Sequence, residues 1–141
     1  MASTLTREGG CRCGAVRFRV EGEPRWVAHC HCADCRRATS AALATYAGFP
    51  RERFAITKGE SRRYASSPGV SRGFCAICGT PLTYEGARWA DEVHIFVCAL
   101  DAPEALQPTA HVYTEGQMPW LHLNDGLRRF ARTSVEGKPL S

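Results

Sequence analysis

The sequence predicts a mainly β fold of several short sheets, and three observations carry that prediction. Apolar and polar side chains alternate in short runs, the first of them at residues 15–20. Turn-forming stretches such as Ser67-Pro68-Gly69 separate these runs at close intervals. Helical periodicity is nearly absent, and many short strands bounded by turns are typical of an all-β domain.

The expected strands can be placed in order along the chain. Residues 15–20 alternate with Val16, Phe18 and Val20 on one face. Residues 26–32 also alternate, and one side of this run carries Trp26, Ala28, Cys30 and Cys32. Apolar runs bounded by turn residues predict the remaining strands at 44–49, 53–57, 62–66, 82–85, 93–100, 110–114 and 120–123.

Two of these strands and two short helices complete the expected fold. The runs 82–85 and 93–100 are expected to pair as a hairpin across residues 86–92. A short helix is expected at residues 33–39, directly after a cysteine-rich stretch. A second is expected at residues 101–106, with Pro103 near its start.

Length and charge limit the class of protein. A chain of 141 residues predicts one domain over residues 1–141. The net charge of +4 is mild and no long basic run occurs, so nucleic acid is weakly indicated and an anionic small molecule fits equally well. No apolar run approaches the roughly 18 residues of a membrane-spanning helix. The first ten residues lack the apolar core of a signal peptide, so a cytoplasmic protein is expected.

The cysteines are the strongest functional signal. Seven of the eight fall in three tight groups. The groups are Cys11-x-Cys13, Cys30-x-Cys32-x-x-Cys35 and Cys75-x-x-Cys78. Stable disulfides are rare in a reducing compartment, and clustered cysteines there favour a metal ion. The sequence therefore predicts zinc.

The first predicted zinc site combines two of the groups. Cys75 and Cys78, followed by Gly79, have the spacing of a zinc knuckle, in which both thiolates reach one ion at about 2.3 Å. A glycine with positive φ would turn backbone N–H groups toward the sulfurs. Cys11 and Cys13 would point the same way from one strand and complete a closed four-cysteine structural site. The alternative is two unrelated pairs of thiols.

The second predicted site has three local ligands, Cys30, Cys32 and Cys35. The fourth position stays open between His29, His31, Cys98 and a water molecule. The two histidines point away from the cysteines if the strand continues, and are expected beside the site or at the surface. Cys98, in an apolar run, is expected to be a buried, inert thiol. An open fourth position is typical of a catalytic zinc.

Three thiolates would make this second site soft, and soft sites prefer soft ligands. An incoming thiol is therefore a natural fourth ligand. A thiol bound to zinc is deprotonated, and the thiolate is the nucleophile. The ligand types thus predict thiol activation followed by attack on an electrophilic carbon.

Three motifs, supported by two weaker ones, relate the chain to a known family. The motifs are GGCRCGAVRFRV at 9–20, CHCADCR at 30–36 and FCAICGTPL at 74–82, with ALDAP at 99–103 and PWLHLNDGLRRF at 119–130. In these stretches, and in their order, the chain resembles the glutathione-dependent formaldehyde-activating enzymes, a family that includes the centromere protein V proteins. It looks like a compact member.

The resemblance implies a fold, a set of ligands and an activity. The implied fold has several short coiled antiparallel sheets around zinc knuckles, the β-tent type. Cys11, Cys13, Cys75 and Cys78 match the family's structural zinc ligands, and the cysteines of CHCADC match its catalytic zinc site. The implied reaction condenses formaldehyde with glutathione to S-hydroxymethylglutathione, which is classed as carbon–sulfur lyase chemistry.

Substrate contacts and the type of function leave alternatives. Arg36 and Arg37, beside the second site, could hold a substrate carboxylate, since guanidinium pairs bidentately with carboxylate; otherwise they form a solvated basic turn. A non-catalytic zinc-binding module for a protein or nucleic-acid partner is a second hypothesis. In a third, both sites are structural and Cys98 or a histidine closes the second.

Overall fold

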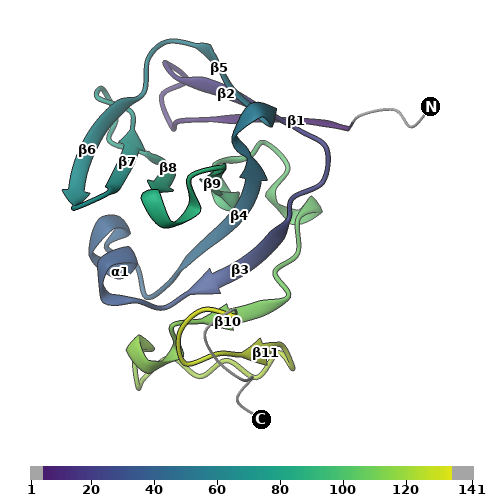
Figure 1. The fold of residues 1–141 in the computed structure, drawn as a ribbon, viewed down its shortest axis with the longest axis vertical. Coiled ribbons are helices and arrows are strands. Elements are labelled where there is room, and N and C mark those ends of the chain that lie inside the picture. The colour runs from purple at the N-terminus through teal and green to yellow at the C-terminus, as the bar shows by residue number, and fades with distance from the viewer. Residues whose placement is uncertain (1–4, 135–141) are drawn as a thin grey trace. The chain divides into compact units, whose positions relative to one another are not determined.

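The computed structural model describes residues 5–134 and confirms a mainly β chain, with 42% of residues in strands and 17% in helices (Figure 1). The chain divides into two compact units, which are described separately. The first contains residues 1–25 and 47–106, and the second residues 26–46 and 107–141. The description leaves out residues 1–4 and 135–141. The first of these ranges belongs to the ten N-terminal residues in which no signal peptide is expected. The single domain over residues 1–141 stays a prediction.

The first unit contains two antiparallel arrangements of strands. β1 (Thr6–Gly10), β2 (Arg17–Glu21) and β5 (Phe54–Lys58) form a sheet in the order β1-β2-β5. β6 (Arg62–Ser67), β7 (Val70–Phe74), β8 (Pro81–Gly86) and β9 (Glu92–Phe96) pair with their chain neighbours as a meander, in which β6, β7 and β8 are seen side by side (Figure 1).

Short 3-10 helices join the strands of this unit. They are η1 (Arg51–Arg53), η2 (Ala87–Trp89), η3 (Val97–Ala99) and η4 (Pro103–Ala105). Its largest fully buried apolar side chains are Phe18, Phe49, Leu82 and Ile95. The expected inward face of residues 15–20 is confirmed, because Val16, Phe18 and Val20 are at most 2% exposed. Their burial removes apolar surface from water and is the main stabilising contribution of β2.

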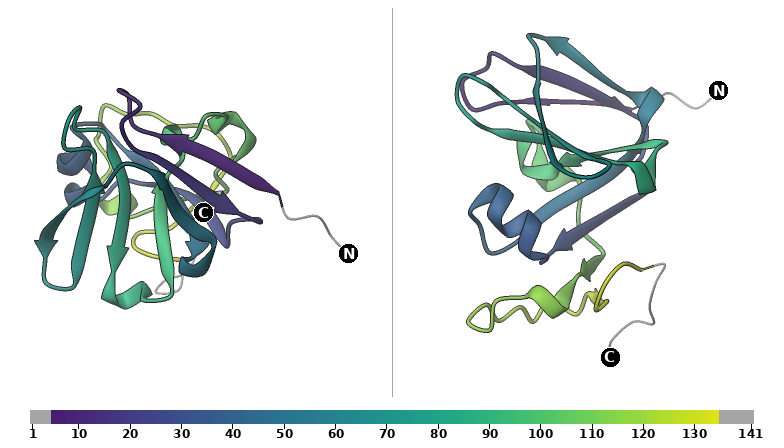
Figure 2. Two further views of the ribbon diagram at one scale, coloured as in Figure 1. Left: turned by 90° about the horizontal axis from the view of Figure 1, so that it is seen from above. Right: turned by 60° about the vertical axis from the view of Figure 1, so that its left-hand side comes forward.

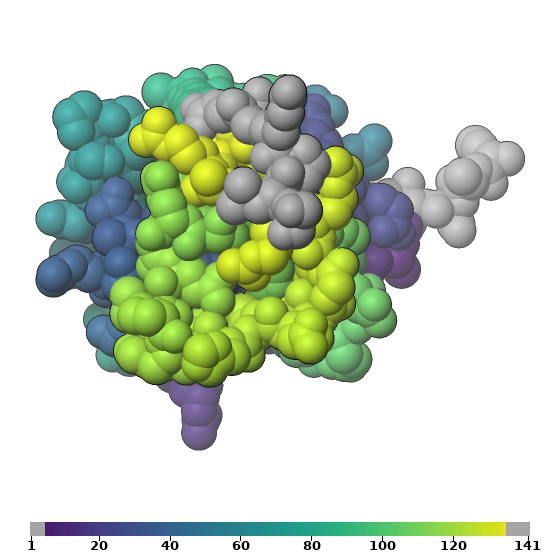
Figure 3. Space-filling model, turned by 90° about the horizontal axis from the view of Figure 1, so that it is seen from below, coloured from purple at the N-terminus to yellow at the C-terminus, as the bar shows by residue number. Residues whose placement is uncertain are grey.

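The second unit is built around β3 (Trp26–Cys30) and β10 (Ala110–Val112). β10 pairs in parallel with β3 and with the two-residue strand β11 (Arg128–Arg129). This pairing sets His111 opposite His29. The α1 helix (Ala33–Thr39) follows β3, and η5 (Thr114–Gly116) follows β10. Figure 2 shows this path from two sides, and Figure 3 shows the surface formed by residues 107–134.

β4 (Ala44–Pro50) runs from the second unit into the first. Strands with bounds within a few residues of the expected ones are found for 44–49, 53–57, 62–66, 82–85 and 110–114. The expected hairpin across residues 86–92 is confirmed by the antiparallel pairing of β8 with β9. The helix at 33–39 has the predicted bounds, and the one at 101–106 is the 3-10 turn η4.

Three expected strands are wrong in extent or existence. The strand at 26–32 ends at Cys30, because Cys32 is the N-cap of α1. The strand at 93–100 ends at Phe96, where the chain tightens into η3. Residues 120–123 form no strand, since the Leu121 N–H is used in a turn to the Met118 carbonyl. Strands β1, β7 and β11 were not predicted.

Among the described residues, no helix combines the length and apolar character required to cross a membrane.

Candidate metal centres

Four cysteines of the first unit form what we call the first cluster: Cys11, Cys13, Cys75 and Cys78. Their Sγ atoms all lie within 4.8 Å of one another, so the four could hold one metal ion. The Cys11–Cys13 sulfurs are 3.6 Å apart and the Cys13–Cys75 sulfurs 3.9 Å. Cys11 and Cys75 are buried, whereas Cys13 and Cys78 are exposed. The two pairs expected to meet are therefore together.

Tight turns direct backbone N–H groups at these sulfurs. The N–H groups of Ile77 and Cys78 lie 3.4 and 3.5 Å from Cys75 Sγ. Gly79 has φ +80°, as the knuckle requires, and its N–H donates to the Cys75 carbonyl at 2.8 Å. A side chain at that φ would be strained although nothing crowds the position. Donated hydrogen bonds favour the thiolate form that a metal needs.

The other half of the first cluster corrects the prediction in one respect. β1 ends at Gly10, so Cys11 and Cys13 converge through a turn and not along a strand face. In this turn Gly14 has φ +82°, and the Val16 N–H approaches Cys11 Sγ at 3.2 Å. The first cluster thus consists of two knuckle-like turns facing each other.

The electrostatics of the first cluster differ between its members. A hydrogen bond with the Thr80 hydroxyl, 3.2 Å away, lowers the pKa of Cys78 to about 5. The backbone N–H of Arg12 donates to the same hydroxyl at 3.0 Å and so links the two turns. Crowded thiolates repel each other, and bound metal would offset that repulsion by supplying positive charge.

Three cysteines of the second unit form the second cluster: Cys30, Cys32 and Cys35. Their sulfurs also lie within 4.8 Å of one another, and Cys30 Sγ is 3.5 Å from Cys35 Sγ. Cys30 is the last residue of β3, and Cys35 lies in the first turn of α1. Cys32 caps that helix, with its Sγ accepting from the Cys35 N–H at 3.3 Å. The strand end and the helix start therefore bring the three together.

The second cluster lies in a less exposed environment than the first. Cys30 and Cys35 are 7% and 5% exposed. Hydrogen bonding with Cys32 and Cys35, together with burial, raises the pKa of the Cys30 thiol. The Tyr46 hydroxyl donates to Cys35 Sγ at 3.3 Å. Three soft donors with a tyrosine beside them could hold a thiophilic metal ion.

The fourth-ligand candidates are placed as follows. His29 donates or accepts at Nδ1 with the Thr45 hydroxyl, 2.8 Å away. His31, expected beside the site or at the surface, is completely buried. Cys98 was expected to be buried and is instead exposed on η3, because the strand ends before it. None of these three belongs to the metal-capable group formed by the second cluster in the described residues.

The two arginines after the second cluster have different environments. Arg36 Nε donates to the His31 carbonyl at 3.3 Å, and its Nη1 approaches Met118 Sδ at 3.7 Å. Arg37 is exposed, and within residues 5–134 its side chain makes no hydrogen bond or ion pair. Arg36 is thus occupied in supporting the loop, and Arg37 is free to meet a ligand.

A chain of hydrogen bonds that sequence reasoning missed runs through the second unit. His31 Nε2 lies 2.9 Å from His111 Nδ1, and His111 Nε2 lies 2.8 Å from Asp125 Oδ2. Burial lowers the pKa of His31 to about 4, so its ring is neutral near pH 7. The parallel register of β10 with β3 is what brings His111 here, and spacing along the sequence contains no signal of it.

His29, His111 and Asp125 also bring potential ligand atoms within 4.8 Å of one another. The rings of His29 and His111 are stacked, however, with centroids 4.9 Å apart and planes 28° apart. Their in-plane lone pairs therefore run side by side and do not converge. Both His111 nitrogens are already hydrogen-bonded. This geometry favours the hydrogen-bond chain over a third metal site.

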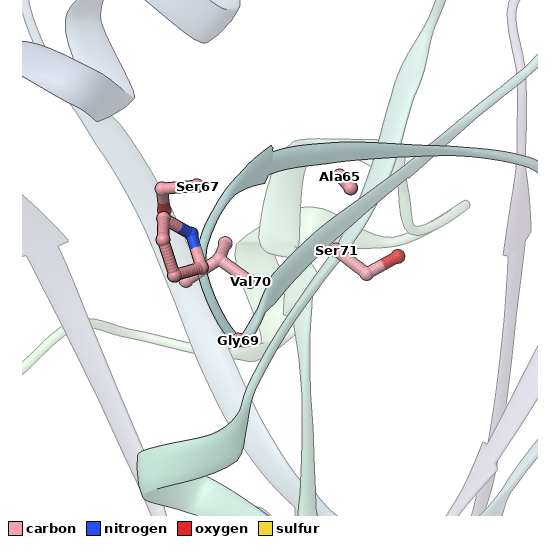
Figure 4. A pocket seen from close by; sticks show the side chains of 6 residues that line it. Ala65, Ser67, Gly69, Val70 and Ser71 are labelled. Atoms are coloured by element: carbon pink, nitrogen blue, oxygen red, sulfur yellow. The ribbon is translucent and has the colours of Figure 1, made fainter.

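A shallow pocket lies at the tip of the β6–β7 hairpin (Figure 4). It is lined by Ala65, Ser67, Pro68, Gly69, Val70 and Ser71. These residues include no cysteine, histidine or charged group, so the chemistry is to be sought at the cysteine clusters.

The sequence and the fold are similar to those of known proteins. A sequence model of the family described as "Glutathione-dependent formaldehyde-activating enzyme" matches residues 6–116. A protein of Halomonas elongata named "Putative glutathione-dependent formaldehyde-activating enzyme" is 32% identical over 127 residues, covering 82% of this chain and 80% of that protein. A crystal structure of a Rhodobacter sphaeroides protein shares the fold, with a TM-score of 0.58 and 23% identity over 72% of this chain and 91% of that one.

Proposed function

The chain belongs to the glutathione-dependent formaldehyde-activating enzyme family, and we propose that it is a zinc-dependent enzyme of the carbon–sulfur lyase type. Its substrates would be a small-molecule thiol, glutathione in the first instance, and a small aldehyde such as formaldehyde. The single observation that carries the proposal is the second cluster, in which three cysteine sulfurs lie within 4.8 Å of one another. Three protein ligands leave one position for a substrate.

We assign zinc to both clusters on the chemistry of their donors. Each cluster consists only of cysteine sulfurs, the ligands of structural and catalytic zinc sites. Cys11, Cys13, Cys75 and Cys78 would hold a structural ion, since four thiolates leave no open position. Cys30, Cys32 and Cys35 would hold the catalytic ion. When bound there, zinc would favour loss of the proton from an incoming thiol.

The addition itself is balanced without any redox partner. The substrate sulfur attacks the carbonyl carbon and forms a carbon–sulfur bond. The π electrons of the carbonyl move to oxygen, which takes up the proton that the thiol lost. The product is a hydroxymethyl thioether, and the reverse reaction breaks the same bond, which gives the lyase classification.

The chain's own residues would orient these reactants. The Tyr46 hydroxyl, donating to Cys35 Sγ at 3.3 Å, would reduce the charge that this sulfur donates and keep it from acting as a nucleophile. Arg37, exposed one turn into α1, would pair with a carboxylate of glutathione. Arg36 would contribute indirectly by holding the His31 carbonyl. A cytoplasmic location, where glutathione is abundant and thiols stay reduced, fits eight unpaired cysteines.

The test is catalysed formation of S-hydroxymethylglutathione from glutathione and formaldehyde, followed by NMR against the spontaneous reaction. Wild type should exceed the spontaneous rate, Cys35→Ser should not, and Cys98→Ser, which removes an exposed thiol outside both clusters, should match wild type. A wild-type rate equal to the spontaneous one would reject this substrate pair. An active Cys35→Ser variant would reject the second cluster as the site. If wild type shows no catalysis, a non-catalytic zinc-binding module for a protein or nucleic-acid partner remains.

A further inference from the structure

The hydrogen-bond chain of His31, His111 and Asp125 has a definite direction. An ionised Asp125 can only accept, so the hydrogen between it and His111 belongs to His111 Nε2. A neutral His111 then accepts at Nδ1, and His31 must donate from Nε2. Burial opposes ionisation of Asp125, but the hydrogen bond from His111 outweighs it and lowers the pKa of this carboxyl. Asp125 therefore determines which nitrogen of both rings carries hydrogen.

His31 is the link between this chain and the second cluster. It stands between Cys30 and Cys32 in the sequence, and its ring is completely buried. Its Nδ1 atom is buried and has no hydrogen-bond partner among residues 5–134. With hydrogen on Nε2, the Nδ1 atom presents a lone pair. The opposite tautomer would instead bury an N–H donor at Nδ1.

The His31 backbone is held as tightly as its ring. Its N–H donates to the Val112 carbonyl at 3.1 Å, and its carbonyl accepts from Arg36 Nε at 3.3 Å. Gly116 packs so closely that a Cβ there would lie 2.7 Å from the same carbonyl oxygen. The ring and the peptide of His31 are therefore fixed by one set of contacts, directly between Cys30 and Cys32.

We propose that Asp125 is a positioning residue of the second cluster: acting through His111, it fixes the tautomer and orientation of His31 and keeps Cys30 and Cys32 arranged for a metal ion. The proposal deepens the proposed function, on which it rests for the metal. Asp125 lies beyond residue 116, where the match to the family ends, so that match assigns it no role. Residues that orient metal ligands typically change metal affinity about 10–100-fold when they are replaced.

The first experiment reads the tautomers directly by nitrogen NMR of the histidine rings in the zinc-loaded protein. In wild type, both His31 and His111 should carry hydrogen on Nε2. Asp125→Ala removes the acceptor, and His111 should then lose this single form. Glu115→Ala is the matched control, since it removes an exposed carboxylate from the same segment. Unchanged tautomers in Asp125→Ala would overturn the proposal.

The second experiment measures metal retention at each cluster. Zinc is withdrawn by a competing chelator, and Co²⁺ loaded in its place reports the thiolate geometry by absorption. Asp125→Ala should lose metal from the second cluster about 10–100-fold more readily, with the first cluster unchanged. Asp125→Asn, which keeps an oxygen to accept from His111, should retain metal better than Asp125→Ala. Equal loss from both clusters, or no difference from Glu115→Ala, would overturn the proposal.

If Asp125→Ala does not fold, Asp125→Glu replaces it, because the longer side chain keeps the charge but misplaces the carboxylate. The same selective loss at the second cluster is expected, and normal retention would overturn the proposal. Neither experiment depends on turnover. Wild type without lyase activity but with the expected tautomers and selective metal loss would reject the proposed reaction and leave the positioning role supported.

Discussion

The sulfurs of Cys13 and Cys75 lie 3.9 Å apart although 62 residues separate them in the chain. Within the first unit, this contact ties the turn after β1 to the turn between β7 and β8. A metal ion at the first cluster would make that link permanent. Because such an ion binds the folded turns and not the unfolded chain, its binding free energy becomes folding free energy.

Replacement of Cys75 by serine should therefore destabilise the protein strongly. We expect the free energy of unfolding to fall by several kcal/mol, on the order of a lost structural metal site or disulfide. Denaturant unfolding of the zinc-loaded protein measures it. Cys98→Ser is the control and should change it by less than about 0.5 kcal/mol, because its thiol is exposed and outside both clusters. Equal stability of the two variants would contradict a structural metal at the first cluster.

Metal should leave the second cluster before the first. Three thiolates with an exchangeable fourth position hold an ion less firmly than four thiolates do. Zinc release into a coloured chelator should therefore be biphasic, with two ions per chain. Cys35→Ser should remove the fast phase and Cys75→Ser the slow one. A single phase for both ions in wild type would count against an open second site.

Arg37→Ala should weaken binding of the thiol substrate without affecting the chemical step. A charged hydrogen-bonded pair contributes about 1.5–3 kcal/mol, so KM for glutathione should rise about tenfold or more with kcat little changed. Arg36→Ala, in contrast to Arg37→Ala, should lower kcat, because Arg36 holds the His31 carbonyl. Arg12→Ala, an exposed arginine at the first cluster, is the control. An unchanged KM in Arg37→Ala would reject the carboxylate contact.

The cysteine groups were predictable from sequence because their spacing is local. A knuckle such as Cys75-x-x-Cys78 is contained within one turn, and the helix expected at residues 33–39 directly follows the cysteine-rich stretch. The pairing of the two knuckles also followed, since a closed zinc site requires four ligands. How the backbone brings the cysteines of each cluster together could not be predicted, because the turns that follow β1 and β3 determine that these strands end at Gly10 and Cys30.

The histidine chain could not be predicted for a different reason. His31 meets His111 across 80 residues, through a parallel pairing of β3 with a three-residue strand. Such a short strand has too little periodicity to reveal its register. The prediction that Cys98 is buried was wrong for a similar reason, since the apolar run around it does not reveal where β9 ends.

Tyr46→Phe should make Cys35 more reactive. The Tyr46 hydroxyl donates to Cys35 Sγ at 3.3 Å. Loss of a hydrogen bond to a charged group removes about 1.5–3 kcal/mol of stabilisation from the thiolate. Alkylation of Cys35 in the zinc-loaded protein should be about tenfold faster or more, as followed by mass spectrometry. Tyr64→Phe, on exposed β6, is the control. Equal alkylation rates in the two variants would show that the Tyr46 hydroxyl does not shield this sulfur.

Asp101→Asn should reduce stability near neutral pH and lose that effect in acid. Arg17 binds the Asp101 carboxylate through two hydrogen bonds of 2.9 and 2.5 Å, and these lower its pKa from the ordinary 3.8. A carboxyl whose pKa is lower in the folded state contributes stability above its unfolded pKa, and this contribution is lost as the pH falls through the folded pKa. Both side chains are substantially exposed, so the contribution should stay below about 1 kcal/mol.

Urea unfolding of wild type and Asp101→Asn at a series of pH values tests this sign. The difference in unfolding free energy should be largest near pH 7 and should shrink below about pH 4, as the wild-type carboxyl takes up its proton. Glu104→Gln is the control, because Glu104 is exposed and has no ion pair within the described residues. A difference that grows in acid would mean that the carboxylate destabilises the fold, and that its pairing with Arg17 does not compensate for its desolvation.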